Sequence, residues 1–161
     1  MTTVTLASVQ ALAASRLGAH ADFAGVEILL EAEESATAAQ LDEFDARFER
    51  ALNSQGVAVV VLSPELANVD KADHSGLSTK LAVAIAICEN PQVNRGEPDA
   101  AANPRRLPAN KSARRLIESA IATLLPEFEF PPQPAGRPTW DDGFWAYYLV
   151  AQRRHVIRAA S

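Results

Sequence analysis

The stretch that most constrains the fold is residues 79–95, which read TKLAVAIAICENPQVNR. Large aliphatic residues alternate there with small ones, the large being Leu81, Val83, Ile85 and Ile87 and the small Ala82, Ala84, Ala86 and Cys88. A period of two places successive side chains on opposite faces of a β-strand. We therefore predict a strand over 81–89 with one bulky face and one smooth apolar face, against which another layer or subunit could lie. Pro91 ends the strand, because proline cannot donate to a sheet ladder.

Hydrophobic periodicity and capping residues divide the rest of the chain into elements in the order helix, strand, helix, strand, strand, helix, strand. The helices are expected over 3–17, from a cap at Ser35 or Thr37 to Gly56, and from a cap at Asn110 or Ser112 to Pro126. The other strands are expected over 26–30, 57–62 and 143–158. The second helix carries Leu41, Phe44, Phe48 and Leu52 at the spacing of a core-facing stripe. Residues 64–77 are expected to form a loop.

The fold class that follows is α+β. The strands at 57–62 and 81–89 have no helix between them, so we expect them to pair as an antiparallel hairpin. The sheet should be mixed, mainly antiparallel, of about four strands, and packed with two or three helices. The 161 residues are expected to form a single domain. Two proline-rich segments, 90–110 and 126–142, are expected as long arms, the second as an extended connector.

Charge is spread unevenly along the chain. The net charge is −5, with −6 in residues 1–60 and +1 in the remainder. An acidic side and a basic side suit head-to-tail contact between identical subunits, whereas duplex DNA requires a more basic footprint. Chance unevenness is the alternative. The candidate interface residues are Asp42, Asp45, Glu49, Arg95, Arg105, Arg106, Trp145, Tyr147, Arg153 and Arg154.

No common catalytic motif is present in the sequence. His74 lies near Asp70 and Asp73, but their spacing matches no metal-ligand signature, and a solvated loop is the simpler interpretation. Cys88, the single cysteine, sits within an apolar strand, where a thiol is usually a small buried hydrophobe. Asp141, Asp142 and Gly143 are first a turn signal. We expect no enzyme, no catalytic residue, no metal and no cofactor.

Targeting signals are also lacking. No apolar run approaches the roughly 20 residues needed to cross a bilayer, and the N-terminus lacks the pattern of a signal peptide. We therefore expect no membrane partner.

The segment KLAVAIAICENPQVNRG resembles tail-terminator, or tail-completion, proteins of contractile- and long-tailed phages and prophages. In that family a long apolar strand ends in a turn of the type E-N-P-x-x-N-R, matched here by Glu89, Asn90, Pro91, Asn94 and Arg95. A helix with a Ser/Ala-rich start follows, matched by residues 111–125. The resemblance covers the organisation of residues 3–125, and the sequence departs from the family in the proline-rich stretch 98–109 and in the aromatic C-terminal strand.

The resemblance implies a structural virion protein without catalytic activity. Its subunits would form a ring, most often a hexamer, that caps the tail tube and joins it to the head connector. The expected partners are its own copies, the tail tube protein and the head connector or adaptor, with DNA passing through the lumen. The expected location is the tail or neck of the virion, reached from the host cytoplasm during assembly. The alternatives are a head–tail adaptor or neck protein and a small cytosolic enzyme that uses Asp70, Asp73 and His74.

Overall fold

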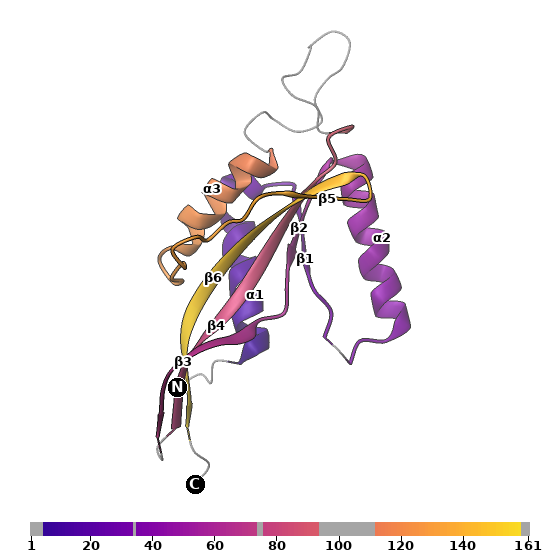
Figure 1. Cartoon of the computed structure of the whole chain (residues 1–161). Helices are drawn as coiled ribbons and strands as arrows, with labels where there is room; N and C mark the ends of the chain where they lie inside the picture. Colours follow the sequence, from indigo (N-terminus) through magenta and orange to yellow (C-terminus); the bar gives the residue numbers. More distant parts are fainter. Residues whose placement is uncertain (1–4, 34, 74–75, 94–111, 159–161) are drawn as a thin grey trace.

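The computed structural model describes residues 5–33, 35–73, 76–93 and 112–158. In these residues three α-helices pack on one six-stranded mixed sheet, with α1 and α3 on one face and α2 on the other (Figure 1). The helices are α1 (Leu6–Ala19), α2 (Ala38–Ser54) and α3 (Ala113–Leu124), with a 3-10 turn η1 (Ala21–Phe23). The strands are β1 (Glu27–Leu30), β2 (Val57–Val61), β3 (Glu65–Asp73), β4 (Gly76–Glu89), β5 (Thr139–Asp141) and β6 (Phe144–Arg158).

The predicted α+β class is confirmed, but the sheet has six strands rather than about four. The strand order is β1-β2-β4-β6-β5, and β3 also pairs with β4. Only the β1–β2 pair is parallel, and the other pairs are antiparallel. The strand predicted from alternation, β4, is the centre of the sheet, and every residue from Gly76 to Glu89 has a partner on β6.

The expectation that residues 64–77 form a loop is wrong. They contain β3, which pairs with the first half of β4, while β2 pairs with the second half as predicted. Both strands lie along the same edge of β4 and are interrupted at Ser63 and Pro64. The pairing of β3 with β4 contains two register shifts, and at each one the regular alternation of side chains between the two faces is interrupted. The sequence of β3 therefore lacks the period of two that identifies a strand. We name β3, the first half of β4 and the end of β6 the strand arm, which projects beyond the helices (Figure 1).

The bulky face of the sheet carries the main core, as the alternation predicted. Ile85, Val59 and Leu149 come from three neighbouring strands and are fully buried against α1 and α3. The helices contribute Val9, Ala13, Leu17, Leu116, Ala120 and Leu124 to this cluster. Thr37 and Ser112 cap α2 and α3, which confirms two of the predicted caps.

The smooth face of the sheet is only partly covered. Ala86 and Cys88 of β4 pack with Ala58 and Ala146 against the C-terminal half of α2, where Ala51 and Leu52 are buried. The prediction that the whole apolar stripe of α2 faces the core is wrong for its first half. Leu41 is 47% exposed and Phe44 is half-buried, because α2 diverges from the sheet towards its N-terminus (Figure 1).

The proline-rich segment 126–138 runs along the outer edge of β6. Single β-bridges join Glu129 to Gln152 and Ala135 to Leu149, so this part of the chain lies against the sheet. It then forms β5, a strand that we did not predict. Asp142 and Gly143 have φ angles of 31° and 91° and make the tight turn from β5 into β6. The first proline-rich segment, 90–110, lies outside the described residues from position 94 onward.

Candidate interaction surfaces

A groove of about 400 Å³ lies between α2 and the turn that joins β5 to β6. Phe48, Leu52 and Phe144 give it an apolar floor, in which the rings of Phe48 and Phe144 meet edge to face with centroids 5.6 Å apart. Carboxylates surround this floor. We call the groove the acidic groove, and its lining is Asp45, Phe48, Glu49, Leu52, Asn53, Asn90, Asp142, Gly143 and Phe144.

Local structure explains why three carboxylates line this groove. Asp45 and Glu49 are four residues apart on α2 and therefore lie on the same flank of the helix. Asp142 is held opposite them because the turn before β6 places two residues at positive φ. All three side chains are exposed, and none forms an ion pair within the described residues. Their mutual repulsion favours the approach of a cation.

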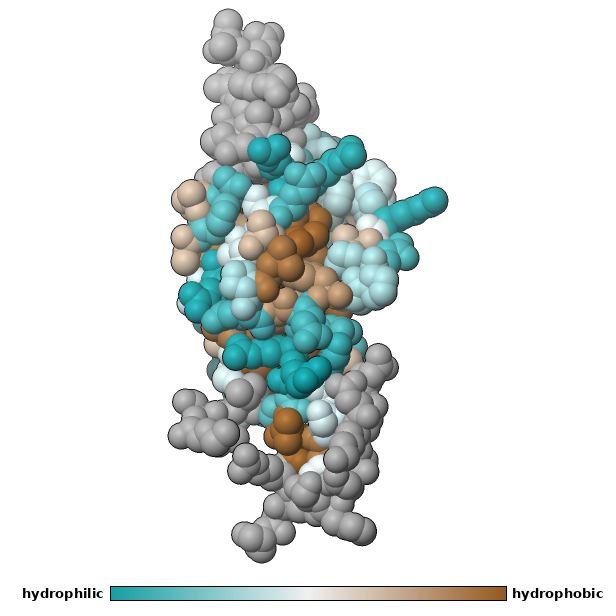
Figure 2. All heavy atoms as spheres, turned by 90° about the vertical axis from the view of Figure 1, so that its left-hand side faces the viewer, coloured by the Kyte–Doolittle hydropathy of each residue, from teal (hydrophilic) through white to brown (hydrophobic). Residues whose placement is uncertain are grey.

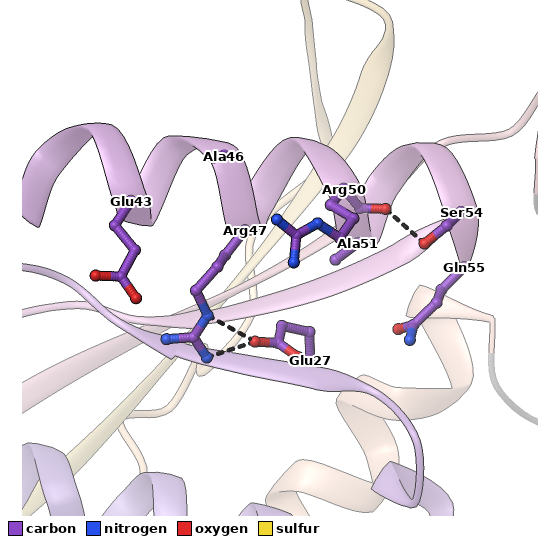
Figure 3. A pocket seen from close by; sticks show the side chains of 8 residues that line it. All are labelled: Glu27, Glu43, Ala46, Arg47, Arg50, Ala51, Ser54 and Gln55. Carbon is purple, nitrogen blue, oxygen red and sulfur yellow. Dashed lines mark hydrogen bonds and ion pairs between the residues drawn. The ribbon is translucent and has the colours of Figure 1, made fainter.

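The other flank of α2 has a different charge pattern (Figure 3). Arg47 reaches β1, where its Nε lies 3.0 Å from Glu27 Oε1 and its second nitrogen binds the same oxygen. This ion pair borders a hollow of about 240 Å³ that Arg50 and Gln55 also line. The buried Oε1 of Gln55 accepts no hydrogen bond from the described residues. Charges of both signs therefore line the hollow beside β1, whereas only carboxylates carry charge in the acidic groove.

The end of β6 brings basic and apolar side chains to the strand arm. Arg154 and Val156 pair with Lys80 and Ser78, which places both on the smooth face of the sheet. Val156 is 56% exposed, and Leu66 and Ile157 are the other large exposed apolar side chains there. Figure 2, which views the side of the sheet covered by α1 and α3, shows apolar atoms at the surface of this lower end as well, below a band of hydrophilic side chains.

The two adjacent arginines of β6 point to opposite faces, so they do not share one surface as the sequence suggested. On the helix-covered face, Glu127 accepts two hydrogen bonds from Arg16, which lower its pKa, and the charge of Arg153 lowers that pKa further. On the smooth face, the pKa of Glu129 is lowered first by a 2.8 Å hydrogen bond from Lys80 and more weakly by the charge of Arg154. Arg154 itself is exposed and forms no ion pair within the described residues.

The other predicted interface residues fall into three groups. Asp42 is exposed on α2, whereas Arg95, Arg105 and Arg106 lie outside the described residues. Trp145 is exposed and packs edge to face on Trp140, with ring centroids 5.1 Å apart. Tyr147 instead packs against the main core, and its pKa is raised by burial and then by the charge of Glu89.

Sequence reasoning missed Trp140, Asp142 and Phe144. The sequence indicates Asp142 first as a turn residue and second as part of a carboxylate pair, and that turn is what holds its carboxylate opposite α2.

A second groove, of about 390 Å³, lies between α3 and the 126–138 connector. Ile117, Pro138 and Tyr148 are among its apolar lining residues, and its charged residues are Arg114 and Glu118, one of each sign. Figure 2 shows an apolar area at the level of α3, on the face that looks left in Figure 1. This groove is apolar and has no excess of either charge.

The described residues considered for an alternative enzymatic site do not form the expected loop. No three histidine, cysteine, aspartate or glutamate side chains come together among the described residues as a metal ion would require. His74 lies outside these residues, and Asp70 and Asp73 belong to β3 rather than to a loop. None of the described helices is long and apolar enough to span a membrane.

Cys88 is expected to resist thiol reagents in the folded protein. Burial, and then the charge of Asp141, raises the pKa of its thiol from 9.0 to about 12. Because the thiolate is the reactive form, a rise of that size lowers its population at pH 8 by about a thousandfold. Labelling with a disulfide reagent at pH 8 should be slow in buffer and fast in denaturant. Fast labelling of the folded chain would show that this face opens readily.

Comparison with known proteins does not assign the chain to a family. No family model matches the sequence. No curated protein matches it either.

Proposed function

We propose that this chain is a structural virion protein of the tail-terminator type, whose copies form a ring at the head-proximal end of a phage tail tube. The sequence supports this through the long alternating strand that ends in E-N-P-x-x-N-R, the feature shared with that family. The observation that carries the proposal furthest is the pair of unlike open surfaces on one face of the sheet: the acidic groove at one end and the basic, apolar end of β6 at the other. A closed ring of identical copies requires two different surfaces on each subunit, one of which binds the other on the next subunit.

The whole surface pattern favours association over catalysis. The acidic groove and the α3 groove are shallow features of about 400 Å³ and 390 Å³, and neither joins a nucleophile to a base. Exposed aromatic residues, including Trp140 at 54% exposure, add apolar surface on the other face of the sheet. Tryptophan and tyrosine are the residues most enriched where protein interfaces are strongest.

The test is the mass of the purified full chain by light scattering, measured over a range of concentrations and with added tail tubes. We expect a ring of defined mass, or its formation on the end of the tube, and electron microscopy should place it there. A chain that stays at 17.3 kDa under both conditions would contradict the proposal.

An adaptor in the neck would form a ring as well, so the partner must be determined separately. Parallel pull-downs with tail tube protein and with head connector distinguish the two functions. A terminator should retain the tube protein, whereas retention of the connector alone would favour the adaptor.

A further inference from the structure

We infer that the acidic groove of one subunit receives the end of β6 from a second copy of the same chain. This inference rests on the proposed ring, and it names the two surfaces that meet in it. The end of β6 is here Arg154 and Val156, the two residues that face away from α1 and α3.

The first argument is the match between groove and strand end. Residues 154 and 156 lie on the same side of a strand, so one strand presents a guanidinium and an apolar side chain together. The groove offers the complementary pair of features, which are the carboxylates of Asp45, Glu49 and Asp142 and the apolar floor built around Phe48. A guanidinium can bind a carboxylate through two hydrogen bonds and can also stack on an aromatic ring.

The second argument comes from charge, which excludes the other open surfaces. The hollow beside β1 is lined by two cations, Arg47 and Arg50, and by two carboxylates, so it has no excess of negative charge to attract Arg154. The groove beside α3 has one charge of each sign, so it does not select a basic strand. Among these three surfaces, only the acidic groove carries carboxylates without a cation in its lining.

The third argument is distance, which makes the contact intermolecular. Phe144 in the groove and Val156 are twelve residues apart on one continuous strand, which at about 3.3 Å per residue places them about 40 Å apart. A subunit therefore cannot insert its own β6 end into its own groove. Both surfaces lie on the smooth face of the sheet, at its two ends, so the contact is head-to-tail and a pair of copies keeps one free groove and one free strand end.

The experiment uses two variants of the full chain that block one surface each. The strand-end variant carries Arg154→Ser and Val156→Ser, and the groove variant carries Asp45→Lys and Glu49→Lys. Sedimentation velocity should show each variant alone as a monomer, with self-association weakened at least about tenfold. An equimolar mixture should form a species of twice the 17.3 kDa chain mass and nothing larger, because only one intact groove and one intact strand end remain to meet.

Matched controls alter charge away from both surfaces. Arg115→Glu on α3, and Glu33→Lys combined with Glu118→Lys, change exposed residues and should leave the assembly at its wild-type size. Arg154→Glu alone tests the strand end with a single exposed change, and thermal unfolding checks that every variant is folded. Combining Arg154→Glu with Asp45→Lys and Glu49→Lys in one chain should partly restore assembly.

The outcomes separate this inference from the proposed function. Rings that persist in both blocked variants would overturn the inference and leave the ring in place. A mixture that stays monomeric, although each variant is folded, would also overturn the pairing. A wild-type chain that never assembles would overturn the proposed function, and with it the basis of this inference.

Discussion

Replacing Ile85 with alanine is expected to lower the free energy of unfolding by about 2–5 kcal/mol. Ile85 is fully buried at the centre of β4, where Val61 of β2 and Leu149 of β6 flank it on the same face. Alanine would lose the burial of three carbon atoms and would leave a cavity. Hydrogen-bonded strands on both sides prevent the sheet from closing that space, so the cost should fall in the upper part of the range.

Urea denaturation at one fixed protein concentration measures this effect, because assembly would otherwise make stability depend on concentration. Leu41→Ala is the matched control, since Leu41 is 47% exposed on α2. It should change the free energy of unfolding by no more than about 0.5 kcal/mol. An Ile85→Ala variant within about 1 kcal/mol of wild type would mean that β4 is not the centre of the core.

The second large effect is expected at Gln10, a buried polar residue of α1. Its Nε2 donates hydrogen bonds to the backbone oxygens of Glu31, at 3.2 Å, and Val61, at 2.9 Å. These bonds fasten α1 to the ends of β1 and β2. Gln10→Leu would keep the volume but remove the donor, and the free energy of unfolding should fall by about 1–3 kcal/mol because the carbonyl of Glu31 would lose its partner.

The same denaturation measurement applies to Gln10, with Gln133→Leu as the control at an exposed position. Amide hydrogen exchange adds a local readout, because β1 should lose protection before the β4–β6 pair does. If the two leucine variants have the same free energy of unfolding, the Gln10 hydrogen bonds make no net contribution to stability.

The sequence was informative wherever local pattern and tertiary environment agree. The alternation from Leu81 to Cys88 predicted both the strand and the difference between its two faces. The large residues of this part of β4 pack in the main core and the small ones pack in the second cluster, so the sequence pattern follows the burial. The caps at Thr37 and Ser112 were predictable for a similar reason, since a cap depends on residues within one helical turn.

The sequence was less informative where distant segments decide the structure. Glu65–Asp73 has little apolar alternation, and it becomes a strand because the first half of β4 supplies its hydrogen-bond partners. The stripe at Leu41 and Phe44 has core-facing spacing, but the first half of α2 diverges from the sheet and leaves Leu41 exposed (Figure 1). Asp142 meets Asp45 and Glu49 across almost a hundred residues of chain, so no local pattern could have grouped them.

The uninterrupted pairing of β4 with β6 has a mechanical consequence for any assembly held by the end of β6. The same two strands run through the buried core and out into the arm, and the ladder continues from Gly76 to Glu89 without a gap. A pull on Arg154 along the strand would load these hydrogen bonds in shear, so that many must break together rather than one after another. A force applied to the end of β6 is therefore transmitted along the paired strands to the core at the centre of the subunit.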